Sequence, residues 1–248
     1  MGVIMVTSYL RSIRALLRLK LNQRHLNHLL SSFDNADGLL EYARKKGYHT
    51  YLSYNRSKEA MLNGFKSLYK VLNIDFKNAS FLDLGPGYGD SMDLALEMGA
   101  KTIEFVDYDP YIVAFNILKG YNGYLLNYLV GKGLTPLYPK KYDIILSKGS
   151  INADKFNRKE NGFIIFTKWI EQVENLATDN GQIIICPTFD RGEEVYMGSY
   201  HVCKDPEAFK KSWFSQVLND NRYEIRYIEN FNNPLRYPFT FHKRMNHV

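Results

Sequence analysis

The sequence predicts an α/β domain: a seven-stranded, mostly parallel, doubly wound sheet with an antiparallel hairpin at one edge, preceded by an N-terminal helical segment. Two observations predict this fold. After residue 75, apolar strand-like runs alternate five times with helical patterns, which requires a parallel sheet covered by helices on both faces. The last two strand patterns are separated only by "NNPLR", which is too short for a parallel crossover, so they must form the hairpin.

The chain has 248 residues, of which 45% are apolar, enough for one large domain with a small appendage. We place the boundary between an N-terminal helical segment, residues 1–75, that would act as a lid, and the α/β domain, residues 76–248. Within the first segment, the apolar periodicity predicts helices over residues 8–30, 37–46 and 58–72.

The first predicted helix is basic, because no acidic residue precedes Asp34. Its apolar and basic side chains fall on different faces: Leu10, Ile13, Leu17 and Leu21 on one, Arg11, Arg14 and Arg18 on another. We interpret it as a helix that packs on its own domain or on a second subunit in a homodimer. Contact with an anionic membrane surface and a mitochondrial presequence are the alternatives.

The elements of the domain follow from short apolar runs and their breakers. Strands are expected over residues 80–85, 101–110, 123–130, 142–149, 182–189, 222–231 and 237–244. Helices are expected over residues 91–99, 111–120, 162–181 and 205–221. Gly99, Gly120 and Gly181 mark three helix ends, while Asp205 and Pro206 open the last helix as cap and first residue.

The stretch "LDLGPGYGD" places glycines at alternate positions directly after a buried strand. Such a turn lets a ligand approach the backbone at a helix amino terminus. Gly85 and Gly87 fit the first two positions of G-x-G-x-x-G, but Asp90 stands at the third and the last glycine comes one residue early, at Gly89. Asp83 and Asp90 flank the loop, and their negative charges disfavour a pyrophosphate as ligand. An amino acid or a sugar, including a ligand with a positive charge, is favoured instead.

Followed by "EFVDYDP", this loop resembles motifs I and II of the class I S-adenosylmethionine-dependent methyltransferases, over about Ser80 to Arg244. The resemblance implies a Rossmann-like methyltransferase fold, with S-adenosylmethionine as cofactor and S-adenosylhomocysteine as product. It implies that Asp83 contacts the cofactor amino group, that Asp107 binds the ribose hydroxyls and that Tyr108 lies beside the adenine. The other cofactor-binding residues that it implies are Gly85, Pro86, Gly87, Gly89, Asn127 and Ser147.

The segments after the fourth and fifth strands bear on the methyl acceptor. "SKGSINAD" lacks the Asn-Pro-Pro-Tyr of adenine-N6 methyltransferases. Metal-dependent catechol-type enzymes carry an acid where this chain has Lys148, and Asp-Asn where it has Pro187 and Thr188, so no metal site is expected. Cys186 is interpreted as a core residue rather than a nucleophile. These patterns leave metal-free methylation, and we expect a small polar molecule or a glycan sugar as acceptor, methylated at oxygen.

Two residues are the catalytic candidates. His201 is the preferred general base, because its ordinary pKa lies near working pH. Lys148 would hold an anionic group of the acceptor. Further acceptor contacts are assigned to Tyr51, Tyr54, Arg56 and Asp190. The alternatives for these residues are a surface histidine without a role, a solvated lysine and ordinary packing of an aromatic-rich linker.

Two other functions stay open. The net charge of +6 and the basic first helix allow an RNA methyltransferase, although nucleic acid is less favoured because the basic residues form one short stripe. The second open function is that of a non-catalytic scaffold subunit that binds the cofactor. Two distant cysteines and no bilayer-length apolar run indicate a cytoplasmic protein, with peripheral membrane contact as an alternative.

Overall fold

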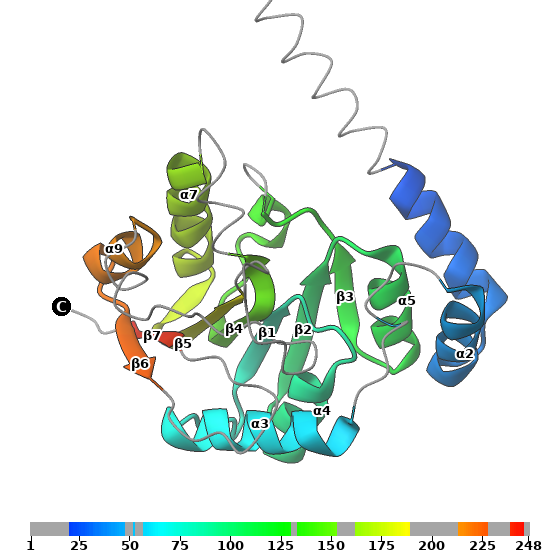
Figure 1. The fold of residues 1–248 in the computed structure, drawn as a ribbon, viewed down its shortest axis with the longest axis horizontal. Helices are drawn as coiled ribbons and strands as arrows, with labels where there is room; N and C mark the ends of the chain where they lie inside the picture. Colours follow the sequence, from blue (N-terminus) through cyan, green and yellow to red (C-terminus); the bar gives the residue numbers. More distant parts are fainter. Residues whose placement is uncertain are drawn as a thin grey trace, which may run out of the picture.

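The computed structural model describes residues 20–47, 52, 57–129, 133–152, 162–188, 213–227 and 239–245. In this part of the chain, seven strands form one sheet in the order β3-β2-β1-β4-β5-β7-β6 (Figure 1). The strands are β1 (Ser80–Leu84), β2 (Thr102–Asp107), β3 (Asn122–Leu125), β4 (Tyr142–Asn152), β5 (Ala177–Thr188), β6 (Glu224–Tyr227) and β7 (Phe239–Arg244).

The strand directions confirm the predicted sheet. The strands β1 to β5 pair in parallel, and β7 pairs antiparallel with both β5 and β6. The second strand of the hairpin therefore enters the sheet beside β5, and the first strand forms the edge. Since β1 lies between β2 and β4, the carboxyl ends of these three strands meet at one edge of the sheet.

The described helices agree with most of the predicted ones. They are a helix through residues 20–32, α2 (Ala36–Lys46), α3 (Lys58–Val71), α4 (Asp90–Glu97), α5 (Pro110–Leu118), α7 (Gly162–Glu174) and α9 (Trp213–Asp220), with one 3-10 turn, η2 (Thr135–Leu137). Asn35 caps α2 by accepting from the Gly38 amide, and Asp109 caps α5 by accepting from the Tyr111 amide.

Several predicted boundaries are wrong, and two of them show the reason. The helix expected over residues 162–181 ends at Glu174, because the Tyr142 amide donates to the Leu176 carbonyl and Ala177 already pairs with β4. The third strand was expected to run to residue 130 but ends at Leu125. There the Leu126 amide donates to the Asp107 carbonyl, and the chain leaves the sheet.

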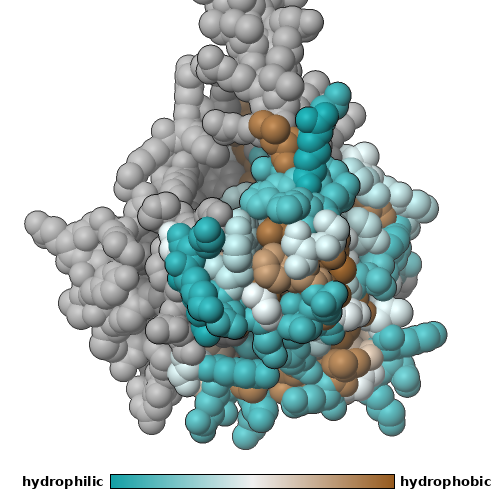
Figure 2. Space-filling view, turned by 90° about the vertical axis from the view of Figure 1, so that its right-hand side faces the viewer, coloured by the Kyte–Doolittle hydropathy of each residue, from teal (hydrophilic) through white to brown (hydrophobic). Residues whose placement is uncertain are grey.

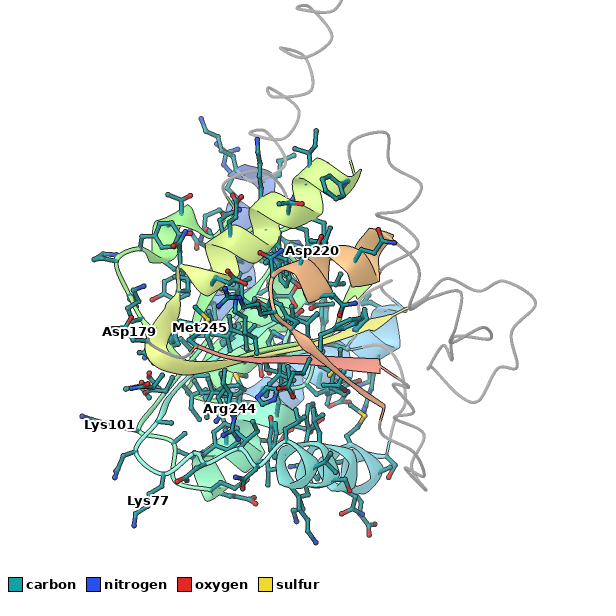
Figure 3. The ribbon with its side chains drawn as sticks, turned by 90° about the vertical axis from the view of Figure 1, so that its left-hand side faces the viewer. Lys77, Lys101, Asp179, Asp220, Arg244 and Met245 are labelled. Atoms are coloured by element: carbon teal, nitrogen blue, oxygen red, sulfur yellow. The ribbon has the colours of Figure 1, made fainter. Side chains whose placement is uncertain are left out.

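Alternate strand residues contribute to two separate apolar clusters, one on each face of the sheet. Phe81, Phe105 and Leu146 pack with α3, α4 and α5, whereas Leu82 and Val106 pack with α7 and α9. Viewed along its edge, the sheet has the yellow-green α7 and orange α9 on one side and the cyan α3 on the other (Figure 3). Burial of both faces explains why the strands read as nearly continuous apolar runs.

The N-terminal helices share the first of these clusters. Leu29, Leu39, Ala43 and Phe65 are buried together with residues of β1 and α5. The helix α2 lies against α5, and α3 lies against α4 (Figure 1). Residues 20–75, where described, are thus part of the same core as the sheet. None of the described helices is both long enough and apolar enough to span a bilayer.

Candidate functional site

The glycine loop connects the carboxyl end of β1 to the amino terminus of α4. The Gly85 amide donates to the Val106 carbonyl at 2.9 Å, so the loop begins beside the end of β2. Gly85, Gly87 and Gly89 have φ values of +88°, +55° and +77°. All three lie in the left-handed region, which glycine adopts without steric cost. The alternate glycines are therefore a requirement of the backbone path.

Gly85 is also a point of close approach. A Cβ added there would lie 2.4 Å from Ser150 Cβ and 2.8 Å from the Tyr128 hydroxyl. The Ser150 hydroxyl donates to the Leu84 carbonyl at 2.7 Å and lies 2.8 Å from the Ser147 hydroxyl. The end of β4 thus lies against the start of the loop. Ser147 was predicted to belong here, whereas Ser150 and Tyr128 were missed, although "SKGS" at a strand end is a signal for such hydroxyls.

The other side of the loop is held by α5. The Asn116 amide nitrogen donates to the Gly87 carbonyl at 2.8 Å, and the Lys119 ammonium donates to the Tyr88 carbonyl at 3.0 Å. Lys119 also pairs with Asp93 on α4 at 2.8 Å. A Cβ on residue 89 would lie 2.3 Å from Asn116 Oδ1. This contact explains why the third glycine comes one residue earlier than in the dinucleotide fingerprint. Sequence reasoning missed both α5 residues.

Asp83 lies at the end of β1 on the face that α3 and α4 cover. Its side chain is only 2% exposed and accepts a hydrogen bond from the Ser91 hydroxyl. Burial raises its pKa to about 7, although the Ser91 hydrogen bond and the positive charge of Lys148 both oppose that rise. The carboxyl group therefore titrates near neutral pH instead of near 4.

Asp107, at the end of β2, has a similar environment. Burial raises its pKa to about 7, against hydrogen bonds from the backbone amides of Asp109 and Tyr108. The Asp109 amide lies 2.9 Å from Asp107 Oδ1. Within the described ranges no side chain donates to this carboxyl group. A buried acid whose partners are backbone amides alone retains acceptor capacity for a ligand with two hydroxyls.

These features fit the predicted cofactor on the chemistry of its parts. Two buried acids lie on adjacent strands, and a loop with glycine at three alternate positions follows the first of them. Both have raised pKa values, so each would be stabilised in its ionised form by a ligand that brings a positive charge or hydroxyl donors. An ammonium group suits Asp83, and a ribose diol suits Asp107.

The other predicted site residues that the structure describes are Lys148, Tyr108, Asn127 and Pro86. The Lys148 ammonium lies 4.6 Å from the centre of the Phe65 ring on α3, within cation–π range. Tyr108 is 58% exposed, and its carbonyl accepts from the Asn22 side chain at 3.4 Å. Asn127 is exposed, and Pro86 lies in the loop itself. Cys186 is buried in the core, as predicted. The roles assigned to Lys148, Tyr108 and Asn127 stay predictions.

Several predicted site residues lie outside the described residues. They are the base candidate His201 and the acceptor candidates Tyr51, Tyr54, Arg56 and Asp190. Among the residues that are described, no three His, Cys, Asp or Glu side chains cluster as a metal site would require.

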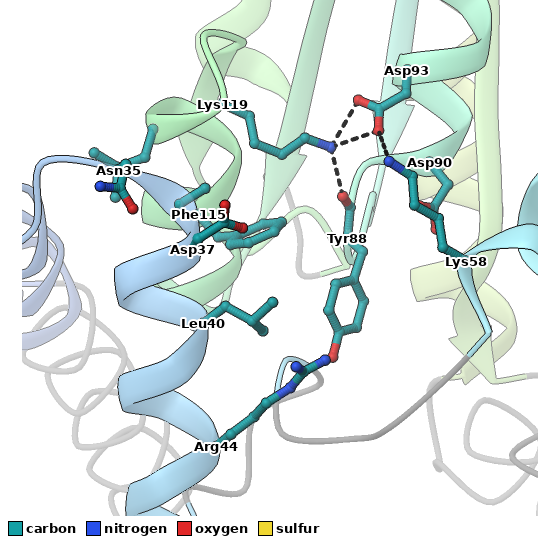
Figure 4. Close-up of a pocket in the computed structure, with 12 residues that line it drawn as sticks. Asn35, Asp37, Leu40, Arg44, Lys58, Tyr88, Asp90, Asp93, Phe115 and Lys119 are labelled. Atoms are coloured by element: carbon teal, nitrogen blue, oxygen red, sulfur yellow. Dashed lines mark hydrogen bonds and ion pairs between the residues drawn. The ribbon is translucent and has the colours of Figure 1, made fainter.

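A cavity of about 480 Å³ opens between the loop, α2 and α5. The face that carries the N-terminal helices is mostly hydrophilic, with some apolar residues visible near its middle (Figure 2). The cavity is lined there by Leu40 and Arg44 of α2, Phe115 of α5, Lys119 directly after α5, and Tyr88 of the loop. Lys119 points across it to the Tyr88 carbonyl and Asp93 (Figure 4). The α5 contacts thus form one wall of this cavity.

Comparison with solved structures confirms the predicted fold class. The chain superposes on a sugar N-methyltransferase from Streptoalloteichus with a TM-score of 0.51 and 11% identity, over 77% of this chain and 88% of that one. A candidate hemolysin from Lactococcus lactis gives a TM-score of 0.50 and 16% identity, with the same coverage of both chains. The magnesium protoporphyrin IX methyltransferase of Synechocystis, crystallised with bound S-adenosylmethionine, gives 0.46 and 12% identity, over 85% and 96%.

The chain therefore has the fold of the class I S-adenosylmethionine-dependent methyltransferases. No protein-family model matches the sequence, and no curated protein matches it.

Proposed function

We propose that this protein binds S-adenosylmethionine and transfers its methyl group to a small polar molecule or a glycan sugar, at oxygen and without a metal. One observation carries the cofactor assignment. Asp83 and Asp107 are both buried, on adjacent parallel strands, with a loop of three positive-φ glycines leading from the first strand. The bound cofactor supplies an activated methyl group on a sulfonium, with a thioether as leaving group.

The chain's own residues hold the reacting groups in place. Asp83 would bind the ammonium group of the methionine portion, and Asp107 would fix the ribose. Fixing both ends restricts the position of the methyl group, and alignment is the main requirement of an in-line displacement. Proton removal from a hydroxyl acceptor is assigned to His201, as the sequence suggests.

The acceptor class is supported by the side chains at the end of β4. Lys148 brings a cation there, between Ser147 and Ser150, whose hydroxyls lie 2.8 Å apart. In the metal-dependent catechol-type methyltransferases, from which this chain departs, an acid stands where this chain has Lys148. An ammonium group favours an acceptor with an anionic or strongly polar group, such as a uronic acid or a sugar phosphate.

Calorimetry with S-adenosylhomocysteine tests the cofactor assignment, and ATP and NADH serve as competitors that share the adenosine portion. We expect binding of the homocysteine nucleoside that neither competitor displaces at equal concentration. Transfer of tritium from labelled S-adenosylmethionine to fractionated extracts then tests the acceptor. Label in the sugar fraction supports the proposal, label in RNA contradicts the acceptor class, and absence of any binding contradicts the whole function.

A further inference from the structure

The helix α5 makes contacts with the glycine loop that the proposed chemistry does not explain. Its first residues follow directly after Asp107, and its cap, Asp109, donates its backbone amide to that carboxyl group. Its last turn reaches the loop through Asn116 and Lys119. A helix of nine residues spans about 13 Å. The helix α5 therefore contacts the turn that follows Asp107 at one end and the glycine loop that follows Asp83 at the other.

Asn116 is the central residue of this arrangement. Its side chain is fully buried, and its amide nitrogen donates to the Gly87 carbonyl at 2.8 Å and to the Ile112 carbonyl at 3.0 Å. Its Oδ1 is buried and has no hydrogen-bond partner among the described residues. A buried oxygen without a partner costs stability, and the two hydrogen bonds that the amide nitrogen donates offset that cost. The bond to the Gly87 carbonyl indicates a role in holding the loop.

Lys119 reinforces the same contact one turn later. Its ammonium group is shared between the Tyr88 carbonyl and the Asp93 carboxylate, at 3.0 and 2.9 Å (Figure 4). The Tyr88 hydroxyl in turn donates to the Leu52 carbonyl at 2.8 Å. Two consecutive loop carbonyls, those of Gly87 and Tyr88, therefore point toward α5. Both contacts restrict the conformation of the loop that follows Asp83.

We propose that Asn116 and Lys119 are positioning residues, which hold the glycine loop in the conformation that binds the cofactor and fix its distance from Asp107. This inference rests on the proposed function. Gly89 belongs to the same device, since any side chain there would displace Asn116. The asparagine at position 116 therefore requires a glycine at position 89.

The test compares Asn116→Ala with Val113→Ala, a matched control on the same helix. Val113 is also fully buried in the apolar core, but its side chain has no polar atom that could donate to a loop carbonyl. Both variants should lower the melting temperature. Only Asn116→Ala should raise the Kd for S-adenosylhomocysteine, by about tenfold or more, because loop ordering then opposes binding. It should also speed amide hydrogen exchange in residues 87–90, which Val113→Ala should leave unchanged.

A second pair of variants keeps the proposal testable should Asn116→Ala not fold. Lys119→Met removes the donor to the Tyr88 carbonyl and the ion pair with Asp93, whereas Asp93→Asn keeps that donor and removes the charge that pairs with Lys119 and Lys58. We expect Lys119→Met to raise the Kd several-fold more than Asp93→Asn. Equal effects within either pair would overturn the positioning role. If the wild-type protein itself does not bind the nucleoside, the proposed function fails instead, so the two failures are distinguishable.

Discussion

Replacing Asp107 by asparagine should remove cofactor binding and yet stabilise the ligand-free protein. The folded state raises the pKa of this carboxyl group from its ordinary 3.8 to about 7, chiefly through burial. At pH 8 the group is ionised in both states, and the folded state carries the cost of the buried charge. A difference of about three pKa units corresponds to about 4 kcal/mol. The amide of the substituted side chain carries no charge, and its oxygen can still accept from the Asp109 amide.

The sign of this effect depends on pH in a defined way. Because the folded state binds the proton more tightly than the unfolded chain, the wild-type protein loses stability as pH rises from about 4 to about 7. Relative to the wild type, Asp107→Asn should gain almost nothing at pH 3, less than about 2 kcal/mol at pH 5 and up to about 4 kcal/mol at pH 8. For a chain of this size such a gain at pH 8 raises the melting temperature by several degrees.

The assay is urea unfolding at the three pH values, together with calorimetry of S-adenosylhomocysteine at pH 8. Asp143→Asn is the matched control. Burial raises the pKa of Asp143, but hydrogen bonds from Ser80 and Thr178 outweigh burial and leave it below its ordinary value. This variant should therefore destabilise the protein at pH 8 and leave cofactor affinity intact. A loss of stability in Asp107→Asn at pH 8, or a gain that is the same at every pH, would refute the reasoning.

Three further outcomes are expected. Gly89→Ala should cost about 2 kcal/mol of stability, because alanine is strained at a φ of +77° and its Cβ would meet Asn116. It should also weaken S-adenosylhomocysteine binding in calorimetry. Unchanged binding would show that the loop does not contact the cofactor. Lys148→Met should lower the turnover number at least about tenfold while the cofactor Kd stays constant, since the charge is assigned to the acceptor; a changed Kd alone would place it at the cofactor. His201→Ala should slow transfer by about a hundredfold with cofactor affinity intact, and turnover equal to wild type would exclude it as the base.

The predictable part of the fold rests on local patterns. Runs such as "FLDLG" and "IILS" are almost continuously apolar. Such composition is typical of parallel strands, because helices cover both faces of a parallel sheet. The helix α7 shows the limit of this approach. Its pattern continues smoothly into residues 175–181, and nothing local reveals that Ala177 pairs with Tyr142 instead. Strand pairing decides that boundary, and pairing is a property of two distant segments.

The predictable part of the site follows the same division. Asp83, Gly85 and Asp107 could be assigned because a backbone path with positive φ and an acid at a strand end leave marks within a few residues. Their raised pKa values could not be assigned, because burial comes from residues throughout the chain. Nor could Asn116, which from sequence reads as one polar residue in an apolar helix.

The succession of strands and helices, the glycine turn and the two acids near it can be found in the sequence, since each depends on spacing along the chain. The surroundings of that turn depend on the three-dimensional packing. Asn116 lies 29 residues from the Gly87 carbonyl that it holds, and Ser150 lies 66 residues from the Leu84 carbonyl. Contacts at such separations are set by how the helices pack on the finished sheet, and no short stretch of the chain encodes them.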